Sequence, residues 1–152
     1  MKVTSIGYGW VGQAMHVLFP YAYIKSKGVG LTSEANKSDV AFVCVPTPVI
    51  GEGKLDMSIV EEVVASCKCP LIVIRSTVNP GTTDYLSRKY DKRIVMQPEY
   101  LGETPNHPMS DQKARQFLVI GGKPEDRRQL IDLYTTVYNA NTTIRQVTAL
   151  EA

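Results

Sequence analysis

A glycine-rich turn near the start of the chain constrains its fold more than any other feature. The residues Gly7-Tyr8-Gly9-Trp10-Val11-Gly12 follow a short apolar run, residues 2–6, and open an apolar stretch, residues 11–19. The spacing G-x-G-x-x-G between a strand and a helix is typical of dinucleotide-binding βαβ units. The first glycine permits the tight turn, the second lets the backbone approach a pyrophosphate, and the third allows close helix–strand packing.

The helix that follows the turn would offer unpaired N–H groups and a partial positive charge to the phosphates. We therefore predict that this turn binds a dinucleotide, and the alternative is a glycine turn kept only for packing. The predicted cofactor-binding residues of the turn are Gly7, Tyr8, Gly9, Trp10, Val11 and Gly12.

The rest of the chain alternates short apolar runs with helical stretches. We expect strands at residues 2–6, 21–25, 40–45, 71–75, 93–96 and 116–120, and helices at 11–19, 58–66, 82–90 and 125–138. Continuous Val, Ile and Leu runs are typical of strands covered on both faces. Ser58 and Glu61 have the spacing of a capping box, which predicts a helix start there. The alternation predicts an α/β fold that is Rossmann-like and doubly wound, with a mostly parallel sheet and helices on both faces.

The composition excludes several classes of protein. The 152 residues correspond to about one domain, and 17 Lys and Arg against 15 Asp and Glu give a net charge of +2, too balanced for a nucleic-acid binder. No apolar run reaches the roughly 18–20 residues that span a membrane. An odd number of cysteines, three, indicates a reducing, cytoplasmic setting. Cys67 and Cys69 are spaced too closely for a zinc knuckle, and we expect no metal site.

The end of the second expected strand lacks the acid that normally holds the adenosine ribose of NAD, about 20 residues after the turn. The segment there reads Tyr23-Ile24-Lys25-Ser26-Lys27, and no acid appears before Glu34. Lys25 and Lys27 either meet the 2′-phosphate of NADP or are simply solvated, and we favour the solvated interpretation. We predict NAD as the cofactor, with NADP as the alternative, and we count Lys25 among the cofactor-binding residues.

Polar residues follow three other expected strands. In an open α/β sheet, ligands bind beyond the carboxyl ends of the strands, so Pro46 and Thr47 after residues 40–45 are expected to touch a cofactor. Thr77 follows residues 71–75, and Glu99 and Glu103 follow residues 93–96 as candidate acid/base or water-orienting groups. The alternatives are a proline-stiffened turn at Pro46 and ordinary surface glutamates.

In their order and spacing these segments resemble the N-terminal NAD-binding domain of the UDP-glucose/GDP-mannose dehydrogenases, the nucleotide-sugar dehydrogenases. The matching stretches are residues 2–12, 43–48, 55–61, 75–78, 80–83, 98–103 and 119–121. The resemblance implies oxidation of a sugar nucleotide's C6 alcohol to a uronic acid, with two NAD molecules used in turn. It also implies that Thr47 and Thr77 line the nicotinamide half of the cleft. Thr77, Glu99 and Glu103 are then the expected catalytic residues, which position substrate or water.

Three departures from the family pattern limit what the resemblance implies. The acid after the second strand is missing, and Phe117 stands where the family usually has an arginine. The family's nucleophilic cysteine lies in a C-terminal substrate domain that this chain lacks. We expect residues 1–147 to form the dinucleotide-binding domain and residues 148–152 to begin the helix that joins the two domains and builds the family's homodimer.

The chain is therefore expected to belong to an oxidoreductase and to be catalytically incomplete alone. Two alternatives stay open. One is the cofactor domain of a β-hydroxyacid or 6-phosphogluconate-type dehydrogenase. The other is a non-catalytic binding module that has lost tight NAD binding. The sequence determines neither the sugar nucleotide nor the oligomeric state of this chain.

Overall fold

A mixed β-sheet forms the centre of the computed structural model, which describes residues 1–25, 33–101, 111 and 113–152. Within these ranges the sheet has seven strands in the order β2-β1-β3-β6-β7-β8-β9. The strands are β1 (Val3–Ile6), β2 (Tyr23–Lys25), β3 (Val40–Val43), β6 (Leu71–Ile74), β7 (Ile94–Met96), β8 (Phe117–Gly121) and β9 (Thr143–Val147). The predicted α/β, Rossmann-like fold is confirmed.

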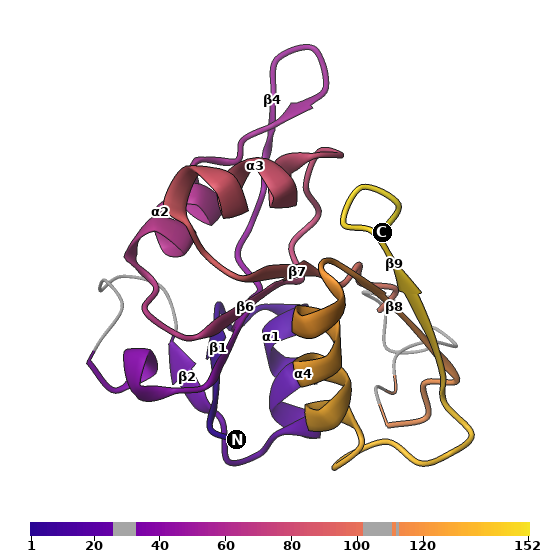
Figure 1. The fold of residues 1–152 in the computed structure, drawn as a ribbon. Helices are drawn as coiled ribbons and strands as arrows, with labels where there is room; N and C mark the ends of the chain where they lie inside the picture. Colours follow the sequence, from indigo (N-terminus) through magenta and orange to yellow (C-terminus); the bar gives the residue numbers. More distant parts are fainter. Residues whose placement is uncertain (26–32, 102–110, 112) are drawn as a thin grey trace.

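Helices cover both faces of this sheet (Figure 1). One face carries α1 (Trp10–Leu18) and α4 (Pro124–Tyr134), and the other carries α2 (Ser58–Ser66) and α3 (Thr82–Tyr90). A short 3-10 helix, η1 (Ala35–Lys37), precedes β3. None of the helices in the described ranges has the length and apolar character needed to cross a bilayer.

The core divides into two layers because successive side chains of a strand point to opposite faces. Phe42 and Val73 face α1 and α4, where Phe42, Phe19 and Tyr134 form an aromatic cluster with ring centroids 5.6 to 6.2 Å apart. Their neighbours Val43 and Ile74 face α2 and α3. The continuous apolar runs predicted to be covered on both faces are buried throughout β3 and β6.

The strand directions create a switch point between β1 and β3. From β1 the chain crosses to β2 at one edge and then returns past β1 to β3, and all three strands are parallel. Such a reversal of winding opens a crevice at the carboxyl ends of the two central strands. Strands β6 and β7 continue in the same direction, so their carboxyl ends lie at the same edge of the sheet.

The last two strands run in the opposite direction. β8 is antiparallel to β7 through the pair Met96 and Gly121, and β9 is parallel to β8. Strand β9 was not predicted from the sequence, and three of its five residues are exposed. An edge strand of this kind lacks the continuous apolar run that predicted the others. Residues 113–116 therefore lead into the sheet at the edge where β7 ends.

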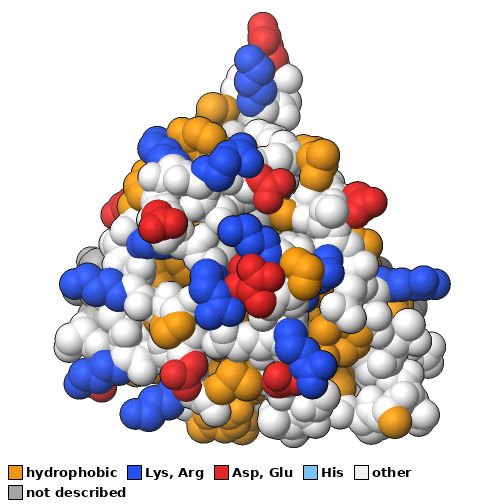
Figure 2. Space-filling model, in the orientation of Figure 1, with side chains coloured by type: hydrophobic (Ala, Val, Ile, Leu, Met, Phe, Trp, Pro, Cys, Tyr) orange, Lys and Arg blue, Asp and Glu red, His pale blue; other side chains and the backbone are white. Residues whose placement is uncertain are grey.

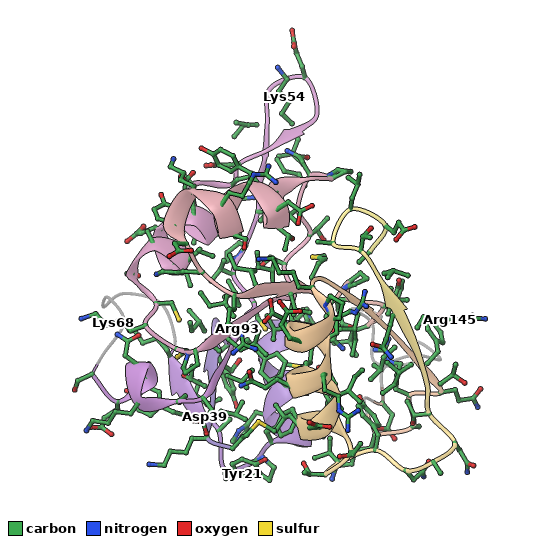
Figure 3. All side chains as sticks on the ribbon, viewed as in Figure 1. Tyr21, Asp39, Lys54, Lys68, Arg93 and Arg145 are labelled. Carbon is green, nitrogen blue, oxygen red and sulfur yellow. The ribbon has the colours of Figure 1, made fainter. Side chains whose placement is uncertain are left out.

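A small hairpin projects from the molecule between β3 and α2 (Figures 1 and 2). It consists of β4 (Val49–Ile50) and β5 (Lys54–Leu55), and its turn contains positive φ angles at Glu52 and Gly53. Lys54 lies at the tip, well away from the sheet (Figure 3). Strands of two residues give too little pattern to be predicted from the sequence.

The predicted helix at residues 58–66 is confirmed, but its predicted capping box and the predicted end of the last helix are wrong. The capping box at Ser58 and Glu61 does not form: Ser58 is the first helical residue, its N–H donates to Asp56 Oδ1 at 2.9 Å, and Glu61 accepts from Lys89 instead. The helix expected to reach residue 138 ends at Tyr134 and continues in turns. In the first case an earlier carboxylate captures the N–H group that the box would have used.

Candidate dinucleotide-binding site

Two glycines of the turn are required by close backbone packing. Gly7 has a φ of +99°, and a Cβ there would lie 2.1 Å from the carbonyl oxygen of Cys44, beyond the end of β3. A Cβ on Gly12 would lie 2.1 Å from the carbonyl oxygen of Gly7. Any side chain at either position would push the turn, α1 and β3 apart. Gly7 and Gly12 therefore fix the shape of the switch point.

Gly9 differs from the other two glycines because it faces open space. It is the N-cap residue of α1, with a φ of −77°, and nothing lies within 4 Å of where its Cβ would be. The first turn of α1 carries no acid, and no side chain caps it. Unsatisfied N–H groups at a helix start, with the positive end of the helix dipole, favour an anion. The turn therefore fits a diphosphate group, which has both the charge and the room it needs.

The other predicted residues of the turn lie around this open space. Tyr8 and Trp10 flank Gly9 and are 43% and 53% exposed, whereas Val11 is half-buried. Exposed aromatic rings beside a helix N-terminus provide apolar surface against which a ligand can pack. Two large exposed side chains thus neighbour Gly9 in the sequence, and the Tyr8 ring lies edge-on to His16 with 6.1 Å between ring centroids.

Lys25 lies at the end of β2, beside the glycine turn. The N–H of Gly7 donates to the carbonyl oxygen of Lys25 at 2.8 Å, and Ile6 is paired with Lys25 in the parallel register. The side chain is half-buried. Lys27, its possible companion, lies outside the described residues.

The ends of β3 and β6 are joined by the hydroxyl of Ser76. Ser76 Oγ accepts the N–H of Val45 at 3.0 Å and donates to the carbonyl oxygen of Val45 at 2.7 Å. This contact brings the segment with Pro46 and Thr47 next to the segment with Thr77. Pro46 and Thr77 are exposed and Thr47 is half-buried. Thr77 was predicted to be a site residue, whereas Ser76, which holds this segment against Val45, was not.

Glu99, a predicted catalytic residue, is held by two guanidinium groups. Arg75 forms an ion pair with its Oε2, and Arg115 Nη2 lies 3.0 Å from its Oε1. The same Oε1 accepts the backbone N–H groups of Tyr100 at 2.7 Å and Leu101 at 2.6 Å. The carboxylate side chain is only 9% exposed. These four contacts fix the Glu99 carboxylate in position. Glu103, the other predicted glutamate, lies outside the described residues.

Arg75 connects Glu99 to the core. Its Nη1 donates to Gln97 Oε1 at 3.1 Å and to the Tyr134 hydroxyl at 3.3 Å, and it lies 3.1 Å from the sulfur of Met15 on α1. The Tyr134 hydroxyl in turn donates to Gln97. Burial raises the pKa of Tyr134 to about 12, so the hydroxyl stays neutral. Burial, together with the charge of Arg75, lowers the pKa of Arg115 below its ordinary value.

This cluster of Arg75, Arg115 and Glu99 was not predicted, although two features of the sequence indicate it. Arg75 directly follows the buried run Leu71–Ile74, and a charge in such a place needs a partner. Arg115 lies two residues before Phe117, the position at which the family usually has an arginine. A buried arginine therefore lies beside the site after all, from a neighbouring position in the sequence.

The three cysteines are all free thiols. Burial raises the pKa of Cys44, next to the switch point, to about 11. Cys67 and Cys69 lie together at the end of α2, and the contact between the two thiols lowers the pKa of Cys67 below its ordinary value. Across the described ranges, His, Cys, Asp and Glu do not gather in any group of three that could hold a metal ion.

The switch point, the glycine turn and the open helix end together define a dinucleotide-binding domain of the Rossmann type. Comparison with known families gives the next step. The sequence profile described as the UDP-glucose/GDP-mannose dehydrogenase family, NAD binding domain, matches residues 24–140. The chain belongs to this family. Because the match begins after the glycine turn and α1, these two features are evidence independent of it.

Individual relatives agree with this assignment. The chain is 31% identical, over 128 residues, to the UDP-N-acetyl-D-mannosamine dehydrogenase of Methanocaldococcus jannaschii, and the match covers 74% of this chain and 29% of that protein. Among solved structures, a UDP-D-ManNAc dehydrogenase from Pyrococcus horikoshii superposes with a TM-score of 0.81 at 17% identity, covering 100% of this chain and 48% of the other. A GDP-mannose dehydrogenase from Pseudomonas aeruginosa gives 0.71 at 21% identity, covering 99% and 47%.

These structural matches show the same fold. The chain spans less than a third of the curated relative and about half of each solved chain. The predicted membership of the nucleotide-sugar dehydrogenase family and the predicted NAD-binding class are confirmed.

Proposed function

We propose that this domain seats the nicotinamide dinucleotide of a nucleotide-sugar dehydrogenase, an enzyme that oxidises the C6 alcohol of a sugar nucleotide to a uronate. The observation that carries the proposal is Gly9: it is the N-cap of an α-helix with no capping side chain, and it faces open space at a switch point. The bound cofactor would supply the hydride acceptor. The substrate would be a nucleotide sugar, as the names of the relatives suggest.

In this proposal the first turn of α1 holds the pyrophosphate through its backbone N–H groups. The exposed rings of Tyr8 and Trp10 pack against the cofactor, and the half-buried Val11 packs within the turn. Pro46, Thr47 and Thr77 line the nicotinamide half, since Ser76 joins the segments that carry them. The hydroxyl groups of Thr47 and Thr77 are suited to orient the carboxamide of the cofactor or an oxygen of the substrate.

The proposal gives Glu99 the role of a positioning residue. A carboxylate bound by Arg75 and Arg115 and by two backbone N–H groups is a fixed acceptor that can orient a water or hydroxyl, rather than a group that exchanges protons. Thr77 stays a predicted catalytic residue at the same edge of the sheet, and Glu103 stays one among the residues that the structure does not describe. A cytoplasmic location also stays a proposal, based on the three free thiols.

Residues 148–152 support the proposed domain boundary after residue 147. Thr148 and Glu151 form a reciprocal capping box: the N–H of Thr148 donates to Glu151 Oε2 at 2.9 Å, and the N–H of Glu151 donates to Thr148 Oγ1 at 3.3 Å. The N–H of Ala152 then donates to the carbonyl oxygen of Thr148, the spacing of an α-helical turn. We infer that a helix starts at Thr148, as expected for an interdomain helix.

The test is calorimetric titration of the 152-residue chain with NAD. Gly9→Ala is expected to weaken binding at least tenfold without changing the melting temperature, because the added methyl group enters the ligand space and contacts no protein atom. Gly51→Ala is the matched control, since its Cβ also meets nothing within 4 Å but lies in the turn of the distant hairpin. Absence of binding of either nicotinamide dinucleotide, NAD or NADP, by the wild-type chain, or equal binding by Gly9→Ala, would contradict the proposal.

A second measurement concerns catalysis. We expect the isolated chain to bind dinucleotide without producing NADH when a nucleotide sugar such as UDP-glucose is added. In the resembling family, the second hydride leaves from a thiohemiacetal formed on a cysteine of the substrate domain. Sugar-dependent NADH formation by these 152 residues alone would contradict this expectation.

A further inference from the structure

The first βαβ unit of the chain contains no carboxylate at all. From Met1 to Ser33 the sequence has no Asp or Glu, and the first acid is Glu34. In dinucleotide-binding domains that select NAD, an acid at the end of the second strand accepts hydrogen bonds from the ribose hydroxyls. The same negative charge repels the additional phosphate that NADP carries on its 2′-oxygen.

The position normally held by that acid is occupied by Lys25. Lys25 is the last residue of β2, its carbonyl oxygen accepts the N–H of Gly7 at 2.8 Å, and it is paired with Ile6. The residue is therefore fixed beside the first glycine of the turn by backbone contacts. A lysine is a compact cation that binds phosphate as a point charge.

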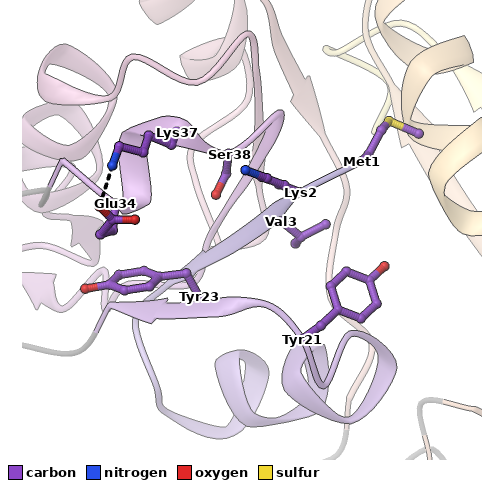
Figure 4. Close-up of a pocket in the computed structure, with 8 residues that line it drawn as sticks. All are labelled: Met1, Lys2, Val3, Tyr21, Tyr23, Glu34, Lys37 and Ser38. Atoms are coloured by element: carbon purple, nitrogen blue, oxygen red, sulfur yellow. Dashed lines mark hydrogen bonds and ion pairs between the residues drawn. The ribbon is translucent and has the colours of Figure 1, made fainter.

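Glu34 does not replace the missing acid, because it lies where β1 and β2 begin, whereas the glycine turn lies where β1 ends. It lines a cavity of about 300 Å³ at the amino ends of β1 and β2, together with Met1, Val3 and Tyr23 (Figure 4). Its carboxylate is 2.5 Å from the ammonium group of Lys37. Since Tyr23 and Lys25 are the two ends of β2, the strand separates Glu34 from the glycine turn.

We propose that the adenosine end of this site accepts a 2′-phosphorylated dinucleotide, so that the chain binds NADP at least as tightly as NAD. The inference rests on the proposed function, because it assumes that the glycine turn seats a dinucleotide. Its basis is the replacement of a negative by a positive charge at a fixed position next to the turn. A site without the acid loses the hydrogen bonds to the ribose of NAD and gains attraction for the 2′-phosphate.

The experiment is calorimetric titration of the chain with NADP and with NAD under identical conditions. The expected result is a dissociation constant for NADP equal to or below that for NAD, with an advantage that falls as salt is added. Lys25→Glu is expected to shift the ratio of the two constants toward NAD by roughly tenfold or more, the order of one charge-assisted hydrogen bond. Lys25→Arg keeps the positive charge and is expected to keep the wild-type ratio.

Lys54→Glu is the matched control for the change of charge. Lys54 is exposed at the tip of the distant hairpin, so its replacement is expected to leave the ratio unchanged (Figure 3). Tighter binding of NAD than of NADP by the wild-type chain would overturn the inference while supporting the proposed function. A folded wild-type chain that binds neither dinucleotide would overturn the proposed function itself. A Lys25→Glu ratio equal to that of wild type would also overturn the inference.

Discussion

Replacing Glu99 by glutamine is expected to destabilise the chain more than removing either of its arginine partners. Among the described residues, the buried cluster contains two guanidinium groups, Arg75 and Arg115, and one carboxylate, so these three side chains together carry one net positive charge. The three side chains are only 2%, 4% and 9% exposed, which limits screening by water. Glu99→Gln leaves two buried cations without a counter-charge, whereas Arg75→Met leaves the neutral pair of Arg115 and Glu99.

Breaking a buried ion pair by removing one partner costs about 3–5 kcal/mol. We expect a loss in this range for Glu99→Gln. For Arg75→Met we expect about 1–3 kcal/mol, because Gln97 and Tyr134 lose a donor but still hydrogen-bond to each other. The double variant removes one cation and the anion, so its cost is expected to be less than the sum of the two single costs.

The assay is urea denaturation at neutral pH, with the free energy of unfolding compared between variants of equal m-value. The prediction would be refuted if Glu99→Gln lowered the free energy of unfolding by less than about 1 kcal/mol, or by less than Arg75→Met does. Strict additivity in the double variant would also refute it, since the two groups would then not interact.

The remaining predictions concern the glycine turn, a buried thiol and a helix start. Gly12→Ala is expected to destabilise the chain by about 1–3 kcal/mol in thermal or urea unfolding, because its Cβ would meet a backbone oxygen; an unchanged midpoint would contradict the packing described. Cys44, with a pKa of about 11, is expected to resist iodoacetamide at pH 8 and to react about tenfold faster per pH unit above that, as followed by peptide mass spectrometry. Modification at the rate of the unfolded chain would count against this. Asp56→Ala is expected to lower the melting temperature more than Ser58→Ala. Because the Ser58 N–H lowers the Asp56 pKa from 3.8, this difference is present at neutral pH and disappears as acid protonates the carboxylate.

The parts of the fold that could be predicted are those encoded locally. The strands β3 and β6 could be predicted because both of their faces are covered, which requires continuous apolar runs. The glycine turn predicts the strand before it and the helix after it. β9 could not be predicted in this way, since it is an edge strand whose pairing with β8 depends on residues about 26 positions away. The start of α2 was predicted by a valid local pattern, but the Asp56 carboxylate competes for the same N–H group.

The candidate site divides in the same way. Gly7, Gly9 and Gly12 form a contiguous motif, and their separate roles follow from its spacing. The cluster around Glu99 joins residues 16 and 24 positions apart, so only the folded chain brings them together. Glu99 could be predicted because it follows a strand, whereas the two arginines that hold it are distant in the sequence.

The reversed direction of β8 determines which parts of the chain contribute side chains near Glu99. An all-parallel sheet presents only the loops that follow its strands at its carboxyl edge. Here β8 enters the sheet at that edge, so Arg115, two residues before a strand, also lies there, against Glu99. Sequence changes next to Arg115, just before β8, can therefore alter the surroundings of Glu99 while the glycine turn and its neighbouring strands stay unchanged.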